Sequence, residues 1–122
     1  MTPPDQGLAL KEYEANVQQA VSEFVADDGL ELQVHSHSTH TGTGGYLEIV
    51  GRSTSSGGLK AFAYRAAQAE LEAQGDSWFT RKALRSLNDM HRAGHLPPAE
   101  EGKIDHQTLK PAEEYRDDTY QS

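Results

Sequence analysis

The chain has 122 residues, of which 35% are hydrophobic and 25% are charged, and its formal net charge is −8. One domain accounts for this length, and the lack of cysteine excludes disulfides, thiol catalysis and Cys-based zinc sites. The acidic net charge disfavours general binding to nucleic acid, because phosphate contact is mainly an electrostatic gain. No segment reads as a signal peptide or a membrane span, so we expect a protein of the cytoplasm, or of a particle assembled inside the cell, without membrane contact.

The N-terminal residues predict a leader followed by an amphipathic helix. Residues 1–8 contain Pro3 and Pro4, which exclude regular structure, and are assigned to an extended N-terminal leader. From about residue 10 to residue 26, apolar residues recur on one broad arc with the period of an α-helix. This arc consists of Leu10, Tyr13, Val17, Ala20, Val21, Phe24 and Val25. The segment is therefore predicted to be a helix that packs on the core, and Gly29 ends it.

Two strands follow, and both show the alternation of a half-buried sheet. The first covers residues 30–38 and places its apolar residues on one face, opposite Glu31, Gln33, His35 and His37. The second covers residues 46–50, with Leu47 and Ile49 facing the core. A turn rich in glycine and threonine separates them, so the two strands are predicted to pair in antiparallel fashion.

Residues 59–74 predict a central helix, because they are rich in alanine and contain no glycine, proline or β-branched residue. Two sides of this helix are apolar, so we expect a sheet on one side and another helix on the other. A further helix is predicted over residues 78–93, where Phe79, Ala83, Leu87 and Met90 share one face. The opposite face of that helix carries a stripe formed by Arg81, Arg85 and Arg92.

Residues 97–122 have the composition of an extended C-terminal arm. Most of them are polar or charged, and the single apolar residues Ile104, Leu109, Tyr115 and Tyr120 lie five or six positions apart. That spacing matches neither a helix face nor a strand face. We interpret these four residues as isolated anchors that bind a partner.

The charge distribution also favours contact with a partner. Residues 1–28 carry six acids and one base, and residues 95–122 carry seven acids and three bases, whereas residues 59–94 carry more bases than acids. The arginine stripe, Arg81, Arg85 and Arg92, is therefore a second predicted partner-binding surface, which suits either an acidic end of a neighbouring copy or phosphate.

His35, His37 and His40 form the only metal-like cluster of the sequence. Alternate residues of a strand point to the same side about 6–7 Å apart, so two imidazoles can share a divalent ion and His40 can close the site from the loop. No carboxylate or cysteine stands at a ligand spacing. The alternative is a polar strand face on which histidine is tolerated, and we expect no cofactor.

Two weak resemblances to nucleic-acid-binding families arise from the order of the elements. The helices 59–74 and 78–93 resemble a helix-turn-helix, and Leu84, Leu87, Met90 and the run Gly94-His-Leu96 are similar to the end of a winged-helix recognition helix. The order helix, two strands, alanine-rich helix resembles a double-stranded-RNA-binding domain, although the third strand and the Lys-Lys-x-Ala-Lys helix start are missing. The helix-turn-helix resemblance implies a small regulator that contacts phosphate through the basic face of the helix 78–93.

The sequence therefore predicts an α+β protein in the order α-β-β-α-α, with a small antiparallel sheet packed against helices. Residues 9–96 form the single domain, between a leader of residues 1–8 and an arm of residues 97–122. The leading hypothesis is a non-enzymatic assembly or adaptor subunit that forms a homo-oligomer or joins a larger complex. In architecture it is similar to neck, connector and tail-completion proteins of tailed viruses. The nucleic-acid-binding regulator is the first alternative, and a small metal-binding enzyme that depends on histidine is the second.

Overall fold

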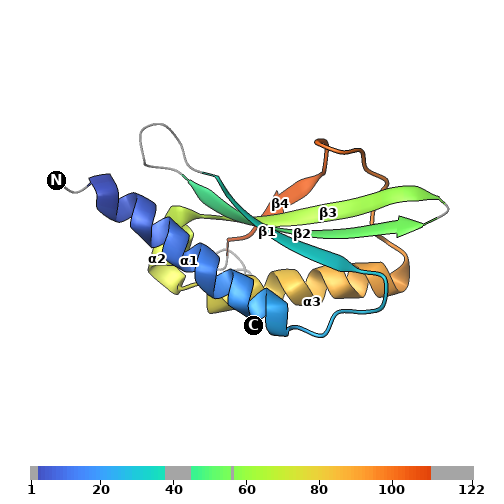
Figure 1. Cartoon of the computed structure of the whole chain (residues 1–122), viewed down its shortest axis with the longest axis horizontal. Coiled ribbons are helices and arrows are strands. Elements are labelled where there is room, and N and C mark those ends of the chain that lie inside the picture. The colour runs from blue at the N-terminus through green and yellow to red at the C-terminus, as the bar shows by residue number, and fades with distance from the viewer. Residues whose placement is uncertain (1–2, 38–44, 56, 111–122) are drawn as a thin grey trace, which may run out of the picture.

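A computed structural model describes residues 3–37, 45–55 and 57–110 of the chain (Figure 1). Helices and strands follow one another in the order α1 (Pro3–Glu23), β1 (Glu31–His37), β2 (Tyr46–Ser55), β3 (Gly58–Ala67), α2 (Gln68–Gln74), α3 (Ser77–Ala93) and β4 (His106–Thr108). The predicted α+β class is confirmed. The predicted order α-β-β-α-α is followed approximately, and β3 and β4 are the strands that it lacked.

The four strands form one sheet in the order β1-β2-β3-β4. The pairs β1–β2 and β2–β3 are antiparallel as expected, whereas β4 runs parallel to β3, so the sheet is mixed. Figure 1 shows α1 and α3 on one side of this sheet and β4 at its far edge. The described residues thus form two layers, in which helices cover only one face of the sheet.

The core lies between that sheet face and the helices. Leu47 and Ile49 of β2 are fully buried, as their alternation predicts, and they belong to the same cluster as Val17 of α1 and Phe79 and Leu87 of α3. Helix α3 therefore buries the face that its periodicity indicates, and α1 buries Leu10 and Val17 of its predicted arc. The predicted end of that helix at Gly29 is wrong, because α1 ends at Glu23 and Val25, assigned to the same arc, is 90% exposed. The predicted sides of β1 and β2 are confirmed by this burial.

The predicted central helix over residues 59–74 is wrong in its first half, because residues 58–67 form strand β3. Only two residues separate the end of β2 at Ser55 from the start of β3 at Gly58, which is a common length for a hairpin connection. Alanine favours a helix by less than 1 kcal/mol per residue, a preference that pairing along a whole neighbouring strand overrides. Phe62 and Tyr64, two positions apart, were the overlooked strand signal.

Helix α1 begins at Pro3, so the residues assigned to an extended leader are largely helical. Proline is compatible with the first turn of a helix, because the N–H group that it lacks has no partner within the helix there. The expectation that Pro3 and Pro4 exclude regular structure applies to the interior of a helix and not to its beginning.

The described part of the predicted C-terminal arm packs against the chain's own sheet. The backbone N–H groups of Ala61 and Ala63 donate to the carbonyls of Pro97 and Asp105, each at 3.0 Å. The N–H group of Leu109 donates to the carbonyl of Arg65 at 2.8 Å, and its side chain is only 2% exposed. Residues 97–109 therefore close the outer edge of β3.

Replacing Leu109 with alanine is expected to lower the free energy of unfolding by about 2–5 kcal/mol, because it removes a buried side chain and leaves a cavity. Urea denaturation followed by circular dichroism measures this change. The matched control is Lys110→Ala at the neighbouring exposed position. Equal stability of the two variants contradicts the placement of Leu109 in the core.

Candidate functional site

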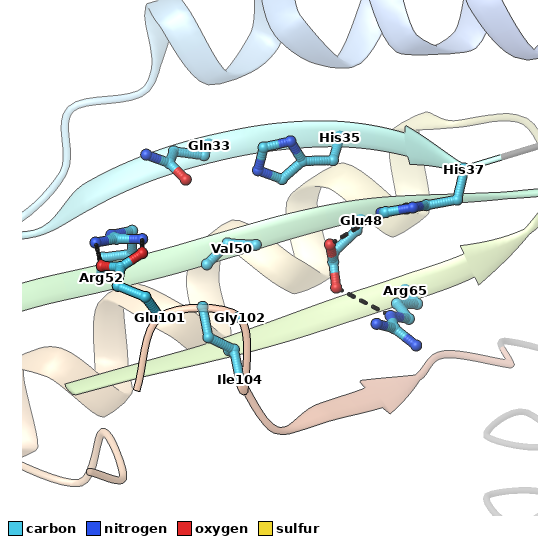
Figure 2. A pocket seen from close by; sticks show the side chains of 10 residues that line it. All are labelled: Gln33, His35, His37, Glu48, Val50, Arg52, Arg65, Glu101, Gly102 and Ile104. Atoms are coloured by element: carbon cyan, nitrogen blue, oxygen red, sulfur yellow. Dashed lines mark hydrogen bonds and ion pairs between the residues drawn. The ribbon is translucent and has the colours of Figure 1, made fainter. Parts of the chain in front are cut away.

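The sheet face opposite the helices, called the open face below, carries a groove with a volume of about 470 Å³. Strands β1, β2 and β3 form its floor, and the segment before β4 forms one wall (Figure 2). The lining residues are Gln33, His35, His37, Glu48, Val50, Arg52, Arg65, Glu101, Gly102 and Ile104. Side chains alternate between the two faces along a strand. The alternation that directs Leu47 and Ile49 into the core therefore directs Glu48, Val50 and Arg52 into this groove.

Arg52 fixes the wall of the groove to its floor. Its guanidinium forms a two-pronged ion pair with Glu101, in which Nη1 donates to Oε1 at 3.3 Å and Nη2 donates to Oε2. The Arg52 Nε atom also lies 3.9 Å from a carboxylate oxygen of Glu31. The hydrogen bond between Arg52 and Glu101 lowers the pKa of the carboxyl and raises the pKa of the guanidinium.

A second set of polar side chains, called the Glu48 cluster below, consists of His37, Tyr46, Glu48 and Arg65. Glu48 is only 8% exposed, and its carboxylate accepts a hydrogen bond from Nε of Arg65 at 2.9 Å. Nε2 of His37 lies 3.3 Å from the other carboxylate oxygen. A buried carboxylate is costly unless it is paired and hydrogen-bonded, and the Glu48 cluster meets both conditions.

The ring of Tyr46 lies between the two partners of Glu48. It stacks on the imidazole of His37 with ring centroids 4.6 Å apart, and the guanidinium of Arg65 lies over it at 4.6 Å from the ring centroid. Nη1 of Arg65 also lies 3.0 Å from Nε2 of His106 in β4. The Glu48 cluster therefore joins β1, β2, β3 and β4 across the open face.

The structure places two of the three predicted metal ligands together. His35 and His37 lie on the same side of β1 with their ring centroids 6.5 Å apart, and His37 is directed toward Glu48 and Tyr46. His40 falls outside the described residues. In the part of the chain that the structure describes, no group of three His, Cys, Asp or Glu side chains is arranged to hold a metal ion. The metal site stays a prediction.

The predicted partner-binding residues lie on different parts of the molecule. Arg81, Arg85 and Arg92 are exposed on α3. Ile104 lines the groove, whereas Leu109 is buried in the core and is not available to a partner. Tyr115 and Tyr120 lie outside the described residues.

Sequence reasoning missed Glu48, Arg52, Arg65 and Glu101. Glu48 was within reach of prediction, because its strand was correctly assigned and the alternation of that strand turns it outward beside the histidines of β1. Arg65 was missed because its strand was assigned to a helix. Glu101 carries no local signal, since its contact with Arg52 depends on the path of the segment before β4.

Comparison with known protein families, with curated proteins and with solved structures finds no match to this chain. Among the described residues, no helix has both the length and the apolar character that crossing a membrane requires. The function is therefore argued from the geometry of the open face and of the sheet edges.

The pKa of Glu101 is expected to rise toward its ordinary value in the variant Arg52→Gln, because that variant removes the donor that stabilises the carboxylate. Since the pKa is lowered in the folded protein, the ion pair stabilises the wall of the groove above the ordinary carboxyl pKa. This stabilisation is lost as the pH falls through the lowered value. A pH titration of the Glu101 carboxyl resonance by NMR measures both states. Lys103→Gln is the control, and an unchanged pKa in Arg52→Gln contradicts the assignment.

Proposed function

We propose that this protein is a non-enzymatic assembly or adaptor subunit, which acts by binding other protein chains within a complex. The observation that carries the proposal is a sheet that the described helices cover on one face only. Its open face bears a polar groove, and its outermost long strand, β1, pairs with β2 alone among the described residues.

The charged groups of the open face suit recognition by a protein surface. Arg52 is paired with Glu101, and Arg65 is paired with Glu48, so both cations on the floor of the groove already have an anionic partner. A protein that covers this face adds hydrogen bonds at the rim without trapping an unpaired charge, which is the cost that most weakens a polar interface. Ile104, which lines the same groove and is partly exposed, supplies an apolar contact.

The two edges of the sheet differ in whether the chain itself covers them, and this difference supports the same proposal. Residues 97–109 close the edge at β3 with backbone hydrogen bonds from the chain itself. At the other edge, no described strand lies beyond β1. A free edge presents unpaired N–H and C=O groups and is a common site at which a second chain adds a strand.

In its more specific form, the proposal is a neck, connector or tail-completion protein of a tailed virus, present in the cytoplasm or in a particle assembled there. The support is a small α+β domain that has acidic ends and a basic side on α3. Repeated copies of such a domain can contact one another through opposite charges.

A nucleic-acid-binding regulator is the second candidate, favoured by the exposure of Arg81, Arg85 and Arg92 on α3. The helix-turn-helix resemblance no longer supports it, because residues 59–67 are strand and not helix. The third strand of the double-stranded-RNA-binding resemblance is present as β3. However, the helix that follows carries Glu70 in its first turn, where that resemblance requires lysines.

The full chain is expected to have a mass above the 13.4 kDa of one copy when it is measured by light scattering and native mass spectrometry. The mass should rise with protein concentration, because association follows mass action. A single copy at every concentration and salt condition contradicts the proposal.

Charge reversal on α3 separates the two candidate functions. For an assembly subunit, Arg81→Glu together with Arg85→Glu is expected to lower the mean mass of the complex, and the unmodified chain should show no salt-sensitive DNA binding. Light scattering and DNA titrations at two salt concentrations measure the two properties. Lys11→Glu, at an exposed position of α1, is the matched control. Salt-sensitive DNA binding that the double variant loses, with an unchanged mass, favours the regulator.

A further inference from the structure

Among the described residues, strand β1 lies at an edge of the sheet, with no strand beyond it. It spans seven residues, Glu31–His37, with the sequence Glu-Leu-Gln-Val-His-Ser-His. Edge strands that stay single are usually short, or carry lysine, proline or a bulge. This strand has no lysine, proline or bulge, although Glu31 is charged, and its pairing with β2 is continuous over all seven positions. The composition of β1 therefore favours pairing of this edge with a strand of another chain.

We propose that β1 pairs with β1 of a second copy of this chain, in antiparallel orientation about a two-fold axis at Val34. The inference rests on the proposed function, since it names the partner and the surface through which the subunit assembles. A two-fold interface uses the same patch on both copies, and two equal strands meet the requirement when they run antiparallel.

The period of the strand limits the register. A shift by one residue turns every side chain to the wrong face. The residue numbers of two residues that lie opposite each other must therefore add to an even number. An axis at Val34 pairs all seven residues, whereas axes at Gln33 or His35 leave residues of β1 unpaired at the ends. The axis at Val34 thus retains the most backbone hydrogen bonds.

The axis at Val34 also matches the side chains. On the open face, Glu31 lies opposite the partner's His37, and Gln33 lies opposite the partner's His35. Hydrogen-bonding pairs across strands are favourable, and no two like charges meet in this register. An axis at His35 instead places two imidazoles opposite each other, and no residue of the second copy's β1 then lies opposite Glu31. The dimer has one continuous sheet with both open faces on the same side.

Cross-linking tests the register directly, because the chain contains no cysteine of its own. Two variants are made separately, Glu31→Cys and His37→Cys, both at exposed positions. In the proposed dimer these positions are opposite each other across the axis, within reach of a disulfide. Two copies of the same variant place their cysteines about 20 Å apart along the strands, which is too far for a disulfide.

Mild oxidation of an equal mixture is therefore expected to give a cross-linked dimer containing one copy of each variant, identified by mass spectrometry. Each variant oxidised alone should stay uncross-linked. Cross-links of equal yield within and between variants, or no cross-link in a sample that light scattering shows to be associated, overturn the proposal.

A charge test supplies an independent readout. Gln33→Lys together with His35→Lys places lysines opposite lysines, and dimerisation should weaken about tenfold or more. Gln33→Glu together with His35→Lys places opposite charges across the axis and should keep the dimer. The first variant brings the acidic chain closer to neutrality, so a loss of dimer in it cannot come from net charge. Equal sedimentation of the two variants overturns the register, and circular dichroism verifies their fold.

These outcomes separate the two proposals. Association of the full chain without the cross-link between positions 31 and 37 overturns pairing through β1 and leaves the assembly function standing. A protein that is a single copy under all conditions overturns both.

Discussion

The antiparallel pairing of β2 with β3 is the constraint on which the rest of the structure depends. Each strand is ten residues long, and their register runs without a break from Tyr46 opposite Ala67 to Ser55 opposite Gly58. Alternation along this pair divides the side chains into two sets. One set packs against α1 and α3 and forms the core, and the other set forms the floor of the groove. A shift of one residue would exchange the two sets and expose the core.

Small side chains on β3 allow the chain to close the far edge of the sheet. Ala61 and Ala63 are fully buried, and their backbone N–H groups bind carbonyls of the segment that follows α3. That segment continues into β4 and buries Leu109, so the edge of β3 is satisfied within the chain. The same segment carries Glu101 to Arg52 and completes the groove. The composition that suggested a helix thus serves close approach between backbone segments.

The polar open face and the free edge of β1 have a common consequence for function. A domain of this size buries a modest share of its surface, so contact with other chains adds stability that its own core cannot supply. In the Glu48 cluster and in the pair of Arg52 with Glu101, each charged side chain is hydrogen-bonded to a group of opposite charge, which holds it in position. A polar face beside a strand that pairs on one side only, among the described residues, is well suited to specific association.

Periodicity in the sequence was enough to predict α3, the faces of β1 and β2, the α+β class, and the existence of α1 but not its bounds, because an amphipathic pattern reports which side of an element is buried. It was not enough for β3, β4 or the groove. Residues 59–67 have alanines that favour a helix, and only the neighbouring strand of the hairpin converts them to a strand. Arg65 reaches Glu48, and Glu101 reaches Arg52, across 17 and 49 positions of sequence, so only the tertiary structure brings these charges together.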